Sequence, residues 1–508
     1  MFFVNIFNYI NLEEQKHEIT TDIKITPHEQ QIFDTLLEVA KINNLDTIIR
    51  VSGGWVRDKM LHKDSKDIDF ALDNMKGVEF AEMICAHLYP GEGKKYGKIS
   101  ANSEKSKHLE TATLKVHDTF IDLVNLRSEE YTEDSRVPTM KFGTPLQDAE
   151  RRDLTINAMF YNINKKEIED FTGYGVNDLT QGIIRTPLEP LQTFLDDPLR
   201  VLRIIRFATR YNFKILEEID AAIQDPKIKE SLATKVTYER IGRETDLMLG
   251  GVNPSGAIEY FYKYKIFSHI LKFPESCEEL QDENKVNDLT FVSVRICQIL
   301  HKIFDKSLNQ NINQLGVFYC GILLPFKDYD FTIIKKNKKT HTDKAYNYVM
   351  IESLKQPNKL KDFVHTCFSN LDELIYHANS TEFDIIKVGT LVRNIGESLT
   401  EAFMLAMAKQ HFDEHLVDGS EINNENIEYY SAKYSEFYNT IKEHKLHEAY
   451  KLKPLLNGKG LMKLYEIKGG PILKKLTEEV LKWQFLNPDA NLEELEKYMI
   501  DNKDQFLS

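Results

Sequence analysis

The stretch TIIRVSGGWVRDKML at residues 47–61 decides the fold of the first part of the chain. Its β-branched start predicts a strand, Gly53 and Gly54 predict a tight turn, and the residues after them predict a helix. KDIDFAL at 66–72 and TFIDLVNLR at 119–127 predict two more short strands, while the polar residues 96–113 between them predict a loop. Strands interleaved with helices indicate an α/β head.

Outside this head, the helical pattern dominates. One helix is expected from about Pro27 to Asn43, and from Phe194 onward helical periodicity continues nearly to the end of the chain. The predicted fold class is α+β, with an N-terminal α/β head followed by an all-helical remainder. The expected parts are a flexible lead-in at 1–28, the head at 29–187, and helical segments at 188–250 and 251–508.

Length and composition exclude several classes of protein. The 508 residues allow about three or four compact units of roughly 100–200 residues. With 42% hydrophobic and 28% charged residues, the chain is neither collagen-like nor wholly disordered nor a coiled coil. No apolar run approaches the roughly 18 residues that span a bilayer, so we expect no membrane partner. We expect no signal peptide, and the five scattered cysteines fit a reducing intracellular compartment.

The net charge bears on nucleic-acid binding. The chain carries 65 basic and 79 acidic side chains, a net charge of −14. Averaged over the whole surface, this negative charge argues against binding of nucleic acid. A local basic stripe can still bind phosphates on an acidic protein.

Two carboxylates mark a candidate metal site. Asp67 and Asp69 flank Ile68 in a predicted strand, so alternation places both on one face. Carboxylates at this spacing suit Mg²⁺, which completes its shell with waters and phosphate oxygens. A lone pair of this kind is more often a solvated edge, but here Gly53 and Gly54 lie upstream with room for a triphosphate, although such a turn alone is weak evidence. Arg57 could pair with phosphate and Asp122 could add a third carboxylate.

A second signal is FLDDPLRVLRIIRFATRYNF at 194–213. A helical projection places one acid and four arginines on one side, namely Asp197, Arg200, Arg203, Arg206 and Arg210. An arginine stripe is more often a solvated face. However, a carboxylate could accept from the amino group of cytosine or adenine, while a guanidinium beside it could donate to the adjacent ring nitrogen. Uracil and guanine present the reverse order, so such a pair would reject them.

ERRDLTINAMFYN at 150–162 lies between these two signals. Arg151 and Arg152 can grip phosphate or ribose, while Asp153 and Asn157 can hold the arginines and the sugar. In isolation the segment is an ordinary charged helix start.

Taken together, these segments resemble the class II CCA-adding enzymes, the tRNA nucleotidyltransferases of the polymerase-β nucleotidyltransferase superfamily. The similar motifs run in order along the chain: GGWVRD at 53–58 with DID at 67–69 (metal and triphosphate), RRDLTIN at 151–157 (ribose), DFTGYGVNDLTQGIIRTP at 170–187 (hinge), DDPLRVLRIIRF at 196–207 (base template) and VTYERIGRE at 236–244 (helix capping). KSKHLETAT and SRVPTMKFGTP favour the eukaryotic branch.

The resemblance implies roles for particular residues. It implies metal ligation by Asp67 and Asp69, triphosphate contacts through Gly54 and Arg57, nucleotide contacts from Arg152, and base templating by Asp197 and Arg200, with Arg203 and Arg206 holding the template or the phosphates. Asp122 completes the expected catalytic set as the third carboxylate, and Gly53 and Asn157 complete the expected nucleotide-binding set. One departure is Asp196, where the motif often has Glu, but Asp196 is not the base-reading acid.

The implied activity is template-independent addition of C, C and A to the 3′ end of tRNA from CTP and ATP, with Mg²⁺ as cofactor and no protein partner implied. A poly(A) polymerase of the same superfamily, a partial enzyme that adds only CC or only A, and a catalytically silent tRNA-binding protein are the alternatives. The resemblance divides the helical part into a neck at 188–250, which carries the base-template motif, and a body with a tail at 251–508. It is weaker over 251–508, where the lysine-rich segment 452–484 could bind the tRNA acceptor arm or form a solvated helix pair. The expected location is intracellular, in cytoplasm and nucleus, with an additional mitochondrial share as the alternative.

Overall fold

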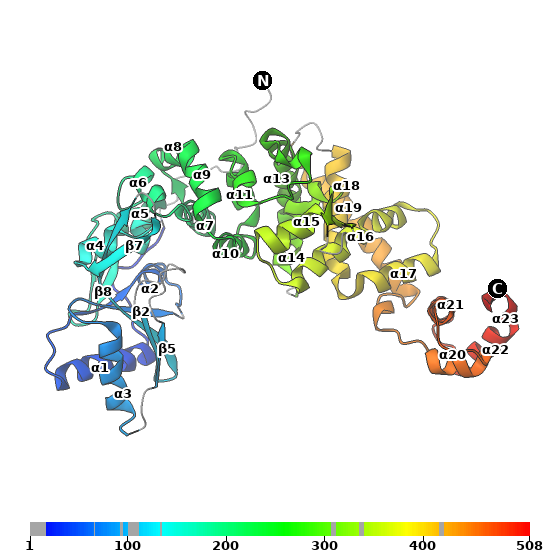
Figure 1. The fold of residues 1–508 in the computed structure, drawn as a ribbon, viewed down its shortest axis with the longest axis horizontal. Helices are drawn as coiled ribbons and strands as arrows, with labels where there is room; N and C mark the ends of the chain where they lie inside the picture. The colour runs from blue at the N-terminus through cyan, green and yellow to red at the C-terminus, as the bar shows by residue number, and fades with distance from the viewer. Residues whose placement is uncertain are drawn as a thin grey trace. The chain divides into compact units, whose positions relative to one another are not determined.

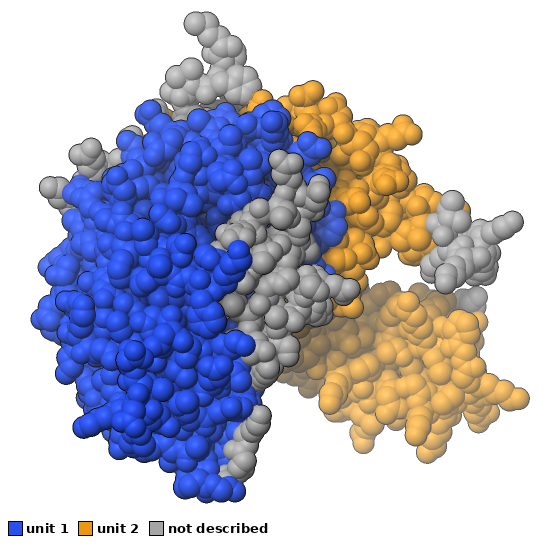
Figure 2. Space-filling view, turned by 60° about the vertical axis from the view of Figure 1, so that its left-hand side comes forward, with its two compact units in different colours: residues 1–248 blue, residues 249–508 orange. Residues whose placement is uncertain are grey.

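A computed structural model of the chain describes residues 17–65, 67–91, 95–99, 111–132, 135–305, 311–334, 340–415 and 421–507. The chain divides into two compact units, residues 1–248 and 249–508, which carry different colours in Figure 2. Across the described ranges, no helix combines the length and the apolar character that crossing a membrane requires.

A mixed seven-stranded sheet forms the centre of the first unit, at the blue and cyan end of the ribbon in Figure 1. The strand order is β3-β4-β5-β2-β1-β8-β9, where β2 and β5 run parallel and the other neighbours run antiparallel. The strands are β1 (Ile49–Ser52), β2 (Ile68–Leu72), β3 (Tyr96–Ile99), β4 (Thr111–Val116), β5 (Thr119–Asn125), β8 (Phe160–Asn162) and β9 (Glu167–Glu169).

The three strands expected from the sequence are β1, β2 and β5. The loop expected at 96–113 is wrong at both ends, because β3 and β4 pair there as antiparallel strands. β3 is an edge strand of the sheet, a position in which polar side chains are tolerated. A strand with polar side chains has the composition of a loop, so the sequence pattern did not identify β3. Residues 100–110 lie outside the described part of the chain.

The two faces of the sheet have different surroundings. Phe33 of α1 (Pro27–Ile42) packs on Phe70 of β2 and Tyr161 of β8, with ring centroids 5.8 and 6.3 Å away. Strand side chains alternate, so Asp69, the neighbour of Phe70, points to the opposite face. On that face Ala149 of α4 (Pro145–Glu150) packs with Phe160 of β8. The sheet therefore presents Asp69 away from the α1 layer.

The segment before α1 is packed against the head. The amide of His17 donates to the carbonyl of Thr180 at 2.9 Å, and the amide of Thr20 donates to the carbonyl of Met60 at 3.0 Å. A capping box formed by Thr26 and Glu29 then starts α1. Residues 17–26 thus revise the expected lead-in at 1–28, while residues 1–16 lie outside the described part.

The remaining elements of the first unit connect the sheet to a helical neck. They are α2 (Gly54–Met60), α3 (Gly77–Leu88), β6 (Arg127–Thr132), β7 (Ser135–Phe142), η3 (Thr155–Asn157), α5 (Gly175–Gln181), β10 (Ile183–Ile184), α6 (Pro190–Asp196), α7 (Arg200–Tyr211), β11 (Lys214–Ile215), α8 (Glu217–Ile223), α9 (Pro226–Lys235) and α10 (Tyr238–Leu249). β10 and β11 pair in parallel, so the neck is largely but not entirely helical.

The second unit is largely helical. Its elements are α11 (Pro254–Lys263), α12 (Phe267–Ile270), η4 (Glu278–Gln281), α13 (Glu283–Asp305), α14 (Gln314–Leu323), η5 (Leu324–Phe326), β12 (Asp330–Ile334), β13 (Thr340–Lys344), α15 (Ala345–Tyr348), η6 (Val349–Ser353), α16 (Asn358–Asn379), α17 (Ile385–Ile395), η7 (Gly396–Ser398), α18 (Leu399–His415), α19 (Asn424–Glu443), η8 (Ala449–Lys451), α20 (Gly458–Tyr465), α21 (Ile472–Leu486), α22 (Leu492–Asp501) and α23 (Lys503–Leu507). The β12–β13 hairpin is a second departure from the all-helical expectation. Helices α20–α23 share a hydrophobic core of their own, which includes Leu461, Leu476 and Met499.

Candidate active site

Two acidic residues face each other across neighbouring strands. Asp69 of β2 and Asp122 of β5 are register partners in the parallel pair, so their side chains lie on the same face of the sheet. Asp67 directly precedes β2. The hydroxyl of Thr113 in β4 donates to Oδ1 of Asp122 and orients that carboxylate. The structure therefore pairs Asp69 with Asp122, and Asp67 lies next to this pair at the start of β2.

The electrostatics of this pair are unfavourable without a cation. Although Asp69 has exposed surface, the pKa of its carboxyl group is raised to about 6. Loss of solvation is the largest cause, the negative charges of Asp122 and Asp67 act in the same direction, and the positive charge of Arg152 opposes them. A positive charge placed between Asp69 and Asp122 would relieve this repulsion.

The donor set suits a cation that arrives with a phosphate-bearing ligand. In the ranges that the structure describes, no group of three or more His, Cys, Asp or Glu side chains is gathered as a metal site. Mg²⁺ does not require such a closed cage, because it takes one or two carboxylates together with waters and phosphate oxygens. Asp69 and Asp122 with Asp67 beside them fit this requirement.

The glycine turn lies against Arg152. Gly53 has φ +73° and ψ −130°, a conformation that L side chains rarely adopt, and it directly precedes α2. A Cβ at Gly53 would lie 3.0 Å from Nη1 of Arg152, and one at Gly54 would lie 3.3 Å from Nη2 of Arg57. Arg152 also acts electrostatically on Asp69. Its guanidinium therefore connects the turn with the acidic pair.

Asp148 holds both arginines of the RRDLTIN segment, and sequence reasoning missed it. Its Oδ1 accepts from Nη2 of Arg151 at 2.6 Å, and its Oδ2 accepts from Nη2 of Arg152 at 2.9 Å. Burial would raise the pKa of Asp148, but the charges of Arg152 and then Arg151 lower it to about 2. The spacing of i, i+3 and i, i+4 was the signal that could have identified it.

Arg57 is buried behind the turn. It is 4% exposed, and its guanidinium donates to Oδ1 of Asp58 at 2.9 and 2.8 Å and to Oδ1 of Asn157. Asn157 in turn donates to Oδ1 of Asp153 at 3.1 Å. The structure therefore places Arg57 and Asn157 in one buried network that supports the site.

Three arginines of α7 make hydrogen bonds within the chain, namely Arg200, Arg203 and Arg206, whereas Arg210 is exposed. Arg203 donates to Oδ2 of Asp153 at 2.7 Å, and Arg206 donates to Oε2 of Glu244 at 2.6 Å. Burial would raise the pKa of Asp153, but Arg203, Asn157 and Arg200 lower it to about 2. This chain of contacts ties η3 to α7 and α10.

The helical projection that placed Asp197 beside the arginines is wrong. α6 ends at Asp196, and Asp197 is an extended residue with φ −141° and ψ 98° before α7 begins at Arg200. Pro198 explains the break, because the residue before a proline is disfavoured in helical conformation. Asp197 accepts from Arg240 of α10, a residue that sequence reasoning assigned no role.

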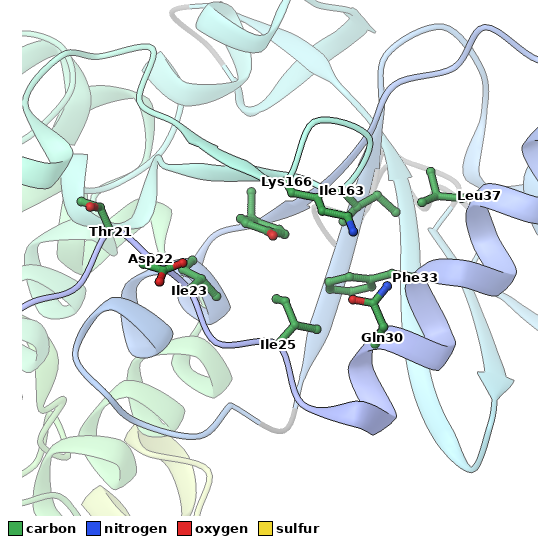
Figure 3. Close-up of a pocket in the computed structure, with 10 residues that line it drawn as sticks. Thr21, Asp22, Ile23, Ile25, Gln30, Phe33, Leu37, Ile163 and Lys166 are labelled. Carbon is green, nitrogen blue, oxygen red and sulfur yellow. The ribbon is translucent and has the colours of Figure 1, made fainter.

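A cavity of about 250 Å³ in the same unit is separate from these residues (Figure 3). It lies between the segment 21–25, α1 and the residues around β8. Its lining comprises Thr21, Asp22, Ile23, Ile25, Gln30, Phe33, Leu37, Tyr161, Ile163 and Lys166. These include none of the predicted site residues, and Phe33 and Tyr161 place the cavity on the α1 side of the sheet.

Comparison with known proteins identifies relatives over nearly the whole chain. Residues 49–185 match the family model described as the poly A polymerase head domain. The chain is similar to the mitochondrial CCA tRNA nucleotidyltransferases of Candida glabrata (36% identity, covering 93% of this chain and 95% of the relative) and Saccharomyces cerevisiae (34%, covering 93% and 92%). Its fold is similar to a CCA-adding enzyme solved in an apo form, with a TM-score of 0.62 and 21% identity over 94% of this chain and 96% of that structure.

Proposed function

The chain belongs to the CCA tRNA nucleotidyltransferase family, and on this premise we propose that its paired carboxylates, glycine turn and arginine networks add C, C and A to the 3′ end of tRNA. CTP and ATP are the substrates and pyrophosphate is released. The resemblance drawn from the sequence motifs is confirmed.

The observation that carries the proposed chemistry is the register of Asp69 with Asp122 beside Arg152. The family typically uses metal ions, and we assign Mg²⁺ to Asp67 and Asp69, with Asp122 as the third acid of the site. When bound, Mg²⁺ would acidify the primer hydroxyl and neutralise the charge on the triphosphate in an in-line displacement. The carboxylates hold the negative charge that keeps such a cation in place.

The remaining residues of the turn bind and orient the nucleotide. Arg152 contacts the triphosphate or ribose, because it lies between the Gly53 turn and Asp69. Gly53 and Gly54 leave room for the phosphates to approach the backbone. Arg57 acts by holding Asn157 and Asp58 in place, since three of its donors are already bound to these two side chains. Arg203 and Arg206 hold α7 through Asp153 and Glu244.

Asp197 and Arg200 read the base. Asp197 accepts from the exocyclic amino group of cytosine or adenine, and Arg200 donates to the adjacent ring nitrogen. Both groups would be left without a partner by uracil or guanine, at a cost of roughly 1–3 kcal/mol each.

The second unit binds the tRNA. We assign the head at 29–187 to catalysis, the neck at 188–250 to base templating, and the body and tail at 251–508 to tRNA. The exposed lysines of α20 and α21 are the candidate phosphate contacts. The two relatives compared above are named mitochondrial, and we assign this chain to cytoplasm and nucleus together with a mitochondrial share.

Single-nucleotide incorporation tests the activity. A tRNA transcript ending before the CCA, and others ending in C and CC, are incubated with Mg²⁺ and each labelled NTP in turn. Two additions from CTP followed by one from ATP are expected. Repeated addition from ATP alone would identify a poly(A) polymerase. Addition of only CC or only A would identify a partial enzyme. Binding of tRNA without incorporation would identify a catalytically silent binding protein.

A further inference from the structure

Arg240 grips Asp197 with a bidentate fork. Its Nη2 donates to Oδ2 of Asp197 at 2.7 Å, and its Nη1 donates to Oδ1 at 3.2 Å. The amide of Leu199 also donates to Oδ1 at 3.2 Å. The side chains of Arg240 and Asp197 are 34% and 23% exposed, so a ligand can reach the pair from solvent.

These contacts leave a defined acceptor position on the carboxylate. Each oxygen of an ionised carboxylate accepts about two hydrogen bonds. Oδ1 already accepts two, from Arg240 and Leu199, whereas Oδ2 accepts one, from Arg240. One position remains on Oδ2, which matches the single amino hydrogen that a cytosine or adenine edge presents beside its ring nitrogen.

Arg200 is fixed in a comparable way. It donates through Nη1 to the carbonyl of Thr193 at 3.3 Å and through Nη2 to the carbonyl of Arg151. It is 8% exposed, and three of its five N–H groups remain after these two contacts. Backbone groups therefore anchor the donor of the pair, while Arg240 anchors the acceptor.

We propose that Arg240 is a positioning residue for base choice, which sets the direction of the free acceptor on Asp197. This inference rests on the proposed function, because it assumes that Asp197 reads the incoming base. A planar guanidinium is suited to the task, since it fixes both carboxylate oxygens in one plane. A lysine would keep the positive charge beside Asp197 but could not fix both carboxylate oxygens in one plane.

The test compares single-nucleotide incorporation from all four NTPs by Arg240→Ala, Arg240→Lys and Asp197→Ala. Arg240→Ala is expected to lower kcat/KM for CTP and ATP by roughly ten- to a hundredfold and to reduce discrimination against UTP and GTP by a similar factor. Arg240→Lys should keep part of the rate and little of the discrimination. Combining Arg240→Ala with Asp197→Ala should cost little beyond Asp197→Ala alone, because the two residues act as one unit.

Arg243→Ala is the matched control, since Arg243 is exposed on the same helix. It should leave the discrimination ratio unchanged. Equal loss of rate on all four NTPs in both Arg240 variants would overturn the proposal and leave Arg240 a structural residue. A gain of rate in Arg240→Ala would also overturn it, because Arg240 would then compete with the base. Failure of the proposed function can be told apart from failure of this inference, since the unsubstituted protein would then itself not select CTP and ATP.

Discussion

At the scale of single residues, the acidic pair of Asp69 on β2 and Asp122 on β5 gives the most direct test of the metal site. Asp69→Asn preserves the shape of the side chain but removes the charge that would hold a cation. We expect incorporation of both CTP and ATP to fall by roughly a thousandfold, because the same chemistry serves both bases. Binding of tRNA should change little. Steady-state incorporation and a filter-binding assay measure the two quantities.

Asp118→Asn is the control for this substitution, because Asp118 has 92% of its side chain exposed in the β4–β5 turn and pairs with Lys115. It should leave incorporation unchanged. Near-normal turnover by Asp69→Asn with Mg²⁺ would show that Asp69 is not a metal ligand.

Asp148 predicts a pH-dependent contribution to stability. Its pKa is about 2 in the folded chain, below the ordinary value of 3.8, so folding favours its ionised form. This contribution is fully present above about pH 4 and is lost as the pH falls toward 2. Asp148→Asn should lower the free energy of unfolding by about 2 kcal/mol at pH 7 and at pH 5, and by less near pH 3.

Urea unfolding at these pH values measures the difference. The chain has two tryptophans, Trp55 in the head and Trp483 in the tail, so fluorescence in a Trp483→Phe background reports on the head. An Asp148→Asn penalty that stayed constant down to pH 3 would contradict the assigned cause.

At the scale of elements, the turn before α2 can be tested with a matched glycine. Gly53 and Gly396 have nearly the same backbone conformation, with φ, ψ of +73°, −130° and +71°, −138°. A Cβ at Gly53 would lie 3.0 Å from Arg152, whereas one at Gly396 meets nothing within 4 Å. Alanine at either position should cost roughly 1–3 kcal/mol of stability through backbone strain.

Only Gly53→Ala should also lower incorporation, because it displaces Arg152 from the turn. Thermal unfolding and incorporation below the melting temperature separate the two effects. Equal activity of the two alanine variants would remove the Gly53 turn from the nucleotide site.

The elements also explain what sequence could predict. The strands β1, β2 and β5 were accessible because their apolar residues are interrupted by recognisable turns, and α1 because Thr26 and Glu29 mark its start. β3 could not be predicted from the sequence, because a polar edge strand lacks the alternation of apolar residues that indicates a strand.

In the site, the acids and arginines could be predicted by type and motif, but their partners could not. Asp197 is not part of a helix because Pro198 follows it, and a helical projection at 100° per residue takes no account of that proline. Arg240 lies 43 residues from Asp197, and no periodicity connects them. Asp148 was missed although it lies within one turn of Arg151 and Arg152, so its spacing alone would have predicted the contact.

At the scale of the whole molecule, a net charge of −14 requires that tRNA binding rely on localised lysines. Lys474 and Lys475 are exposed on α21, which packs through Leu476 in the tail core. Replacing both with alanine should weaken tRNA binding and reduce the slope of log affinity against log salt by roughly one per lost phosphate contact. The KM for CTP should not change.

Lys41 and Lys76, exposed lysines of the head, provide a control of the same charge. Their double alanine variant should leave the salt slope unchanged. If the two double variants shifted the slope equally, the tail would have no special part in binding.

The central place of β1 in the sheet has a consequence for synthesis of the chain. β1 pairs on one side with β2, which follows closely, and on the other with β8, where Ser52 lies opposite Phe160. The partner of that second edge leaves the ribosome about 110 residues later, which takes roughly 5–20 s at ordinary rates of translation. During this interval the nascent sheet has an unpaired edge at its middle. The head therefore completes its fold only after β8 has emerged, and a nascent chain that stalls earlier exposes a strand able to pair with other chains.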